Sequence, residues 1–171
     1  MTDLGKLAYF LGIEFVQSSE GILMHQKRYT LEVLGRFNLI QCNSTNTPVE
    51  ANLKLRSCEQ EPKVDITMFR QMVGCLRFLC HSRPEISYGV DLVSRYMNSL
   101  RYSHLIAAKR ILRYLKGTLD HGVMFPRNMR NQQNECTLHL EAYTDSGWVG
   151  DPVDRHSTMG YVFFLGQTPI S

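Results

Sequence analysis

The chain of 171 residues has 43% hydrophobic and 20% charged residues, a composition typical of globular proteins that excludes disordered and collagen-like classes. Its formal net charge of +3 is too small to indicate a partner by itself. The sequence has no apolar run long enough to cross a bilayer, and its N-terminal residues lack the basic and then apolar order of a signal peptide. We therefore expect a soluble, intracellular protein.

The first predicted element is a β-hairpin between residues 8 and 26. Two β-rich runs surround a polar turn that contains Gly21, and Glu14 is expected to face solvent. A short helix follows over residues 29–37, because apolar side chains recur there at roughly helical spacing.

Two further helices are predicted after a loop that is rich in Asn, Ser, Thr and Pro. Asp65 can cap the first of them, whose apolar stripe contains Ile66, Phe69, Val73, Leu76 and Cys80. Pro84 suits the first turn of the second, which has Ile86, Val90, Val93 and Met97 on one face. We expect the two helices to pack as a hairpin.

The next helix has one apolar arc and one basic arc. Ser103 suits its N-cap and Gly117 its C′ position. The apolar arc contains Leu105, Ala108, Ile111, Leu112 and Leu115. The basic arc contains Lys109, Arg110, Arg113 and Lys116.

Two interpretations of the basic arc remain open. Charged outer faces are normal for amphipathic helices, so the arc can be a solvated surface. Alternatively, cations aligned along a rigid helix can contact the regularly spaced phosphates of a nucleic acid. The composition alone does not decide between them.

The last part of the chain is dominated by strand patterns. The runs TLHLEAYT and MGYVFFLG predict two strands, and Asp145 is expected at the end of the first. Aspartate is common in turns, so Asp145 can be a turn residue. It can also be a carboxylate that a metal-dependent nuclease holds at the edge of its sheet.

Four ordered blocks of sequence carry a family resemblance: DLGKLAYFLGIEF, RQMVGCLRFLCHSRPEISYGVDLVSRYM, HLIAAKRILRYLKGT and EAYTDSGWVGDPVDRHSTMGYVFFLG. In order and spacing the chain resembles Pol polyproteins of copia-type LTR retrotransposons over nearly its whole length. It is similar to the region from the end of the reverse transcriptase palm into the start of RNase H, which implies a truncated fragment of that polyprotein.

The resemblance implies an α+β fold in four parts. Residues 1–28 would end the palm as a β-hairpin near the primer, residues 29–118 would form a helical thumb or tether, residues 119–134 a linker, and residues 135–171 the start of an incomplete RNase H-like sheet. The primer-proximal residues would be Tyr9, Phe10, Leu11, Gly12, Ile13 and Glu14. The basic arc would then face an RNA/DNA template–primer duplex.

For Asp145, the resemblance implies a metal ligand. The matching aspartate of the family is the first of the RNase H carboxylates, which together hold two Mg²⁺ ions. The position two residues later, usually acidic in the family, is Gly147 here.

The resemblance also sets limits on activity. The sequence contains no Tyr-x-Asp-Asp motif, which carries the polymerase aspartates of the family, and the other RNase H carboxylates lie downstream in the family. We therefore expect this chain alone to be inactive in DNA synthesis, with residual nucleic-acid binding at most. The alternatives are an Mg²⁺-dependent RNase H-type nuclease centred on Asp145 and a non-functional relic of a retroelement.

The expected partners are an RNA/DNA hybrid and the remainder of the Pol polyprotein. No membrane is expected as a partner. In an active element, the resemblance implies a location in cytoplasmic virus-like particles.

Overall fold

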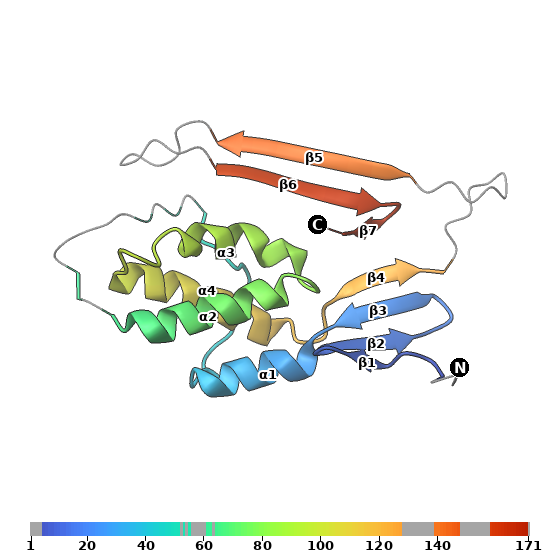
Figure 1. Cartoon of the computed structure of the whole chain (residues 1–171), viewed down its shortest axis with the longest axis horizontal. Helices are drawn as coiled ribbons and strands as arrows, with labels where there is room; N and C mark the ends of the chain where they lie inside the picture. The colour runs from blue at the N-terminus through green and yellow to red at the C-terminus, as the bar shows by residue number, and fades with distance from the viewer. Residues whose placement is uncertain are drawn as a thin grey trace.

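The computed structural model describes residues 5–51, 53, 55, 61–62, 64–127, 139–147 and 158–170. These residues form an N-terminal antiparallel sheet, a body of four α-helices and a second antiparallel sheet (Figure 1). The α+β class expected from the sequence is confirmed. No described helix combines the length and the apolar character needed to cross a membrane.

The N-terminal sheet has the strand order β1-β2-β3-β4. Its strands are β1 (Tyr9–Phe10), β2 (Ile13–Gln17), β3 (Gly21–His25) and β4 (Val123–Pro126). The predicted hairpin is β2 paired with β3. The pairing of β4 with β3 places a strand inside the stretch 119–134, where the sequence indicated only a linker.

Two glycines allow β3 and β4 to approach each other. A Cβ at Gly21 would collide with the carbonyl oxygen of Phe125, and one at Gly122 would collide with the carbonyl oxygen of Met24. Gly21 therefore serves a close backbone approach as well as the turn that its sequence context predicts.

Helix α1 (Lys27–Arg36) begins two residues before the predicted helix. Its N-cap residue, Gln26, makes no capping hydrogen bond through its side chain. Instead the Glu14 carboxylate, from β2, accepts a hydrogen bond of 3.0 Å from the backbone N–H of Arg28. The Glu14 side chain is 19% exposed, so its expected solvent-facing position is corrected: the carboxylate is half-buried against the N-terminus of α1, whose backbone N–H group and partial positive charge attract it.

Helix α2 (Ile66–Leu79) begins as predicted, because Asp65 accepts hydrogen bonds from the backbone N–H groups of Thr67 and Met68. Pro84 begins a short 3₁₀ helix, η1 (Pro84–Ile86), that continues into α3 (Ser87–Ser94). Met97 lies beyond the end of α3, although the periodicity extended the helix to it. Helix α4 (Tyr102–Gly117) follows.

The hydrophobic core lies between the four helices, and α4 contacts each of the other three. Apolar side chains without exposed area come from α1, α2, α4 and η1: Val33, Phe69, Met72, Leu76, Leu79, Ile86, Ala108, Leu112 and Leu115. Helix α3 adds Val90 and Val93, each 1% exposed. The predicted apolar arc of α4 is buried throughout, which confirms the orientation of that helix.

The second sheet has the order β5-β6-β7, with β5 (Leu140–Gly147), β6 (Thr158–Leu165) and β7 (Thr168–Pro169). Both strands predicted in this part are present. Strand β5 continues two residues beyond Asp145, which pairs with Gly160 rather than ending the strand. The sheets meet where the Thr168 hydroxyl donates a 2.7 Å hydrogen bond to the carbonyl oxygen of Met124, beside the helical body (Figure 1).

Candidate nucleic-acid interface

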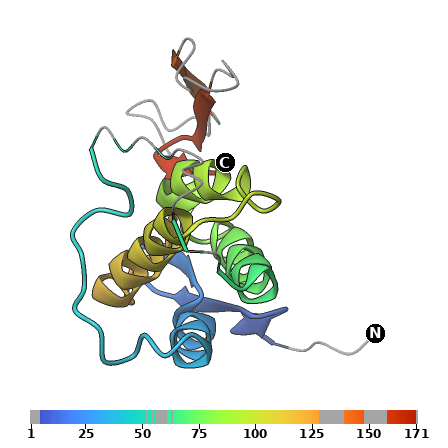
Figure 2. The same cartoon turned by 90° about the vertical axis from the view of Figure 1, so that its left-hand side faces the viewer.

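The basic arc of α4 is partly covered by the protein's own chain. Residues 42–50, which we call the strap, belong to the segment that joins α1 to α2 in the sequence, and they pass along α4 on the side away from α2 (Figure 2). Arg113 Nε donates a 2.7 Å hydrogen bond to the carbonyl oxygen of Asn43. Lys116 Nζ donates a short hydrogen bond to the carbonyl oxygen of Cys42.

Arg110 holds the other end of the strap. Its Nη1 forms a 2.8 Å ion pair with Glu50 Oε1, and its Nη2 donates a 3.1 Å hydrogen bond to Thr47 Oγ1. The strap also donates to α4: the Thr45 hydroxyl donates a 3.4 Å hydrogen bond to the carbonyl oxygen of Arg110. Three of the four predicted phosphate-binding cations therefore contact the strap.

Lys109 differs from its neighbours on α4. It is half-buried, and the part of the chain that the structure describes offers it neither a hydrogen bond nor an ion pair. The sequence grouped the four cations by angle around the helix, whereas the structure separates Lys109 from the three that hold the strap. The strap itself could not be placed from periodicity, because it has none.

The turn between β1 and β2 exposes three large apolar side chains. Tyr9 is 56% exposed, Phe10 57% and Leu11 74%. Leu11 and Gly12 both have positive φ, at 47° and 82°, so the chain reverses sharply at these two residues. The predicted primer-proximal residues are thus close together on one projecting turn.

Helix α2 supports this turn from beneath. A Cβ at Gly12 would lie 3.2 Å from the ring of Phe78, so the turn rests directly on that ring. Phe78 in turn packs edge to face against Tyr29, with ring centroids 4.9 Å apart. Burial, together with a hydrogen bond to Cys75, raises the pKa of Tyr29 to about 12. The exposed turn therefore has a rigid aromatic base.

Asp145, the predicted catalytic carboxylate and metal ligand, lies inside β5, and its side chain is outside the described part of the chain. Within the described residues, no group of three His, Cys, Asp or Glu side chains could hold a metal ion. These residues therefore offer no ligand set for the Mg²⁺ that the family resemblance implies, and the role of Asp145 stays a prediction.

The N-terminus of α4 is capped from a distance. The sequence predicted Ser103 as N-cap, but the helix begins at Tyr102, and the backbone N–H of Ser103 donates a 2.8 Å hydrogen bond to Glu61 Oε2. This hydrogen bond lowers the pKa of the Glu61 carboxyl. The C-terminal prediction also changes, because Gly117 is the last helical residue and Thr118 is the cap.

A buried arginine that the sequence did not single out connects two helix ends. Arg83 is 4% exposed, and its Nε forms a 2.7 Å ion pair with Glu85. Its two terminal nitrogens donate to the backbone oxygen and the hydroxyl of Thr118, and its guanidinium lies 5.6 Å from the ring centre of Tyr114. No periodicity predicts such a contact, because it joins the end of α2 to the end of α4.

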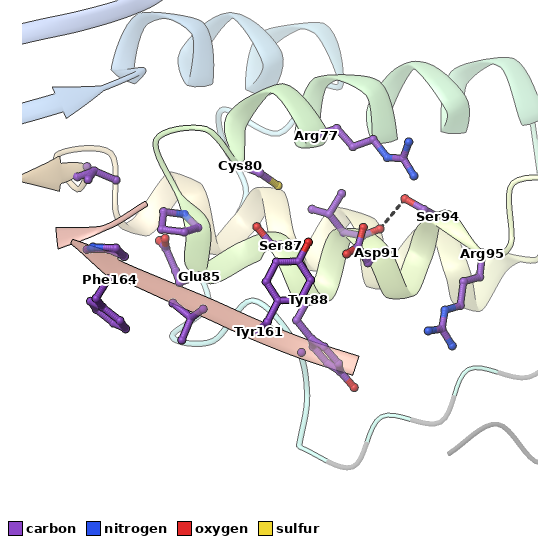
Figure 3. Close-up of a pocket in the computed structure, with 17 residues that line it drawn as sticks. Arg77, Cys80, Glu85, Ser87, Tyr88, Asp91, Ser94, Arg95, Tyr161 and Phe164 are labelled. Atoms are coloured by element: carbon purple, nitrogen blue, oxygen red, sulfur yellow. Dashed lines mark hydrogen bonds between the residues drawn. The ribbon is translucent and has the colours of Figure 1, made fainter. Parts of the chain in front are cut away.

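A cleft of about 960 Å³ separates α2 and α3 from β6 (Figure 3). Its charged lining residues are Arg77, Arg95, Glu85 and Asp91, so two cations balance two carboxylates. Such a balance does not favour a polyanion. Burial raises the pKa of the Cys80 thiol in the same cleft.

Comparisons with known proteins agree with the family resemblance. A family model described as reverse transcriptase (RNA-dependent DNA polymerase) matches residues 1–51. The chain is 41% identical over 169 residues to the retrovirus-related Pol polyprotein from transposon RE1 of Arabidopsis thaliana, covering 99% of this chain and 11% of that polyprotein. It is 41% identical over 165 residues to the polyprotein from transposon RE2 of the same plant, covering 96% of this chain and 11% of that polyprotein.

A shorter relative matches at full length. An uncharacterized mitochondrial protein of Arabidopsis thaliana is 36% identical over 172 residues, covering 100% of this chain and 68% of that protein. No solved structure matches the chain significantly. Since the similarity to the transposon polyproteins extends over nearly the whole chain, the protein belongs to the family of copia-type, retrovirus-related Pol polyproteins.

Proposed function

We propose that this chain is part of a retrotransposon reverse transcriptase and that it positions an RNA/DNA template–primer. The chain spans 11% of the length of the Pol polyproteins RE1 and RE2, so the rest of such a polyprotein would be its partner. Because the sequence lacks a Tyr-x-Asp-Asp motif, the role assigned to this segment is to hold the duplex and not to add nucleotides.

The observation that carries the proposal is the projecting β1–β2 turn. Tyr9, Phe10 and Leu11 are each more than half exposed, and they lie within the residues that match the reverse transcriptase family. Exposed apolar side chains on a rigid base suit contact with the sugars that line the shallow minor groove of a duplex. The support from Phe78 limits the conformational entropy that the turn would lose on binding.

The basic arc of α4 supports the same proposal through charge. Lys109 has no partner among the described residues, and Arg113 uses only its Nε in contact with the strap. Phosphate contacts by such cations add affinity without sequence preference. They weaken at higher salt, because the counterions that binding releases from the nucleic acid then gain less entropy. The proposal therefore predicts shape-directed binding with a measurable dependence on salt.

A fluorescence anisotropy titration with a labelled RNA/DNA hybrid tests this function. We expect Tyr9→Ala combined with Phe10→Ala to weaken binding about fivefold or more, because truncating side chains that matter in an interface costs on the order of 1 kcal/mol or more. Lys109→Ala is expected to reduce the slope of log K against log salt by about 0.9.

Tyr143→Ala is the matched control, since Tyr143 is 58% exposed on the second sheet and lies outside the proposed interface. Equal losses from the turn and from Tyr143 would contradict the assignment of the turn. Hybrid binding that neither salt nor the turn substitutions change would contradict the function as a whole.

A further inference from the structure

We propose that the strap is an internal competitor for the basic arc: it occupies Arg110, Arg113 and Lys116 until a nucleic acid displaces it. The proposal rests on the proposed function and adds regulation to it. The strap holds its three cations through oxygen atoms, as a phosphate backbone would.

The acceptors of the strap are weaker than phosphate. Lys116 and Arg113 bind neutral backbone carbonyl oxygens, and only Glu50 supplies a negative charge, to Arg110. The hydrogen bonds of Lys116 and Arg113 to the strap have an ionised donor but a neutral acceptor, whereas a phosphate would add the Coulomb attraction of a full negative charge. A phosphate that reaches these cations can therefore replace the strap with a net gain.

The position of the strap also allows its middle residues to move away from α4. Asn43, Ser44, Asn46, Thr47 and Glu50 are exposed, so the outer side of the strap is free of other described segments. The two hydrogen bonds by which Thr45 returns to α4 are both 3.4 Å long, near the limit of useful geometry.

Both ends of the strap stay attached to the body. Leu39, just before it, is buried in the core, and Val49 packs so closely on α3 that a Cβ at Gly89 would lie 2.7 Å from Val49 Cγ2. Displacement would therefore move a short tethered segment and would leave the helices packed. The cost of rebinding stays small, because a short tether keeps the strap at high effective concentration.

Gly117 offers a way to weaken the strap without removing a cation. A Cβ at Gly117 would lie 2.9 Å from Ser44 Cβ, so Gly117→Ala pushes against the strap. Gly74→Ala is the matched control, because a Cβ there meets no atom within 4 Å. Both glycines are helical, but Gly74 is in the interior of α2 and Gly117 is the last residue of α4, so Gly74→Ala gains more helix propensity without touching the strap.

The experiment measures hybrid affinity and its salt dependence for the wild type, Gly117→Ala, Glu50→Gln and Gly74→Ala. Affinity scales with the fraction of molecules whose basic arc is free, so we expect roughly threefold or tighter binding for the first two variants. The slope of log K against log salt should stay close to that of the wild type, because the duplex contacts the same cations once the strap is displaced. Gly74→Ala should behave as the wild type.

Hydrogen exchange of residues 42–50 gives a second readout. Adding the hybrid should speed exchange in the strap if the duplex displaces it. Binding that is equal in all variants, with strap exchange unchanged, would overturn the competitor proposal and leave the proposed function intact. Absence of hybrid binding in every variant, including Gly117→Ala, would overturn both.

Discussion

The helical body buries its apolar side chains much more completely than the second sheet does. Phe69 and Leu112, in the body, have no exposed area, whereas Leu140 and Tyr143, on β5, are 62% and 58% exposed. Both regions are rich in apolar residues. The difference is that four helices cover one another, while β5 has a neighbouring strand on one side only among the described residues.

Most of the free energy of folding is therefore expected to come from the helical body. Each buried side chain of the body contributes about 1.5–3 kcal/mol by leaving water. The described side chains of β5 bury little apolar surface. The stability of β5 therefore depends on its backbone pairing with β6 and on the attachment of β7 to β4. We therefore expect the body to be the cooperative unit and the second sheet to be a weakly attached region.

The largest expected effect tests the body directly. Phe69→Ala should lower the free energy of unfolding by about 3–5 kcal/mol, because it empties a fully buried site between helices. Urea denaturation followed by far-UV circular dichroism measures the loss. Tyr143→Ala, the control from the second sheet, should change the same free energy by less than about 1 kcal/mol. A similar cost for both substitutions would remove the distinction between the two regions.

A smaller effect should loosen the second sheet alone. Thr168 is fully buried, and its hydroxyl bonds to the carbonyl oxygen of Met124, so Thr168→Val should cost about 1 kcal/mol. Hydrogen exchange should then become faster in β5 and β6 while α2 and α4 keep their protection. The exposed Thr144 provides the control, Thr144→Val. Equal acceleration in the helices would mean that sheet and body unfold together.

The smallest effect distinguishes two causes of a raised phenol pKa. Burial raises the pKa of Tyr29 to about 12, whereas a hydrogen bond to Glu141 raises that of the exposed Tyr143. The folded chain keeps the Tyr29 proton to a higher pH than the unfolded chain, whose phenol titrates near 10.0. Stability linked to Tyr29 should therefore be complete below pH 10.0 and should fall as the pH rises toward 12.

Difference titration of phenolate absorbance measures this contrast. Tyr29→Phe should remove the part of the pH dependence of stability that Tyr29 contributes in that range. Glu141→Gln should return Tyr143 toward its ordinary pKa and leave Tyr29 unchanged. A shift of Tyr29 in response to Glu141→Gln would contradict the separation of the two regions.

Sequence patterns predicted the elements that bury one regular face. The stripe from Ile66 to Cys80 and the Asp65 cap located α2, and the apolar arc located the buried side of α4. These predictions succeed because periodicity and capping are local properties of the chain. The two strands of the second sheet followed from alternation in the same way.

The remaining features depend on residues far apart in the sequence. Glu61 caps α4 in place of Ser103, and Glu14 caps α1, although neither lies on the helix that it serves. The strap uses cations whose angular positions had been predicted, but with partners that no pattern indicates. Sequence reasoning thus identified candidate cations for the interface without showing what already occupies them.

The pairing of β3 with β4 makes the whole helical body an insertion between two adjacent strands of one sheet. Pairing β3 with β4 joins residues separated by about a hundred positions, whereas the β2–β3 hairpin joins residues only a few positions apart. The entropy cost of loop closure is therefore lower for the hairpin, which we expect to form first. The β2–β3 hairpin can form early, but β4 can pair with β3 only after the helices between the two strands have brought them close together. Met24 and Val123 thus mark a late folding step, and ribosomal synthesis must deliver the entire body before the first sheet is complete.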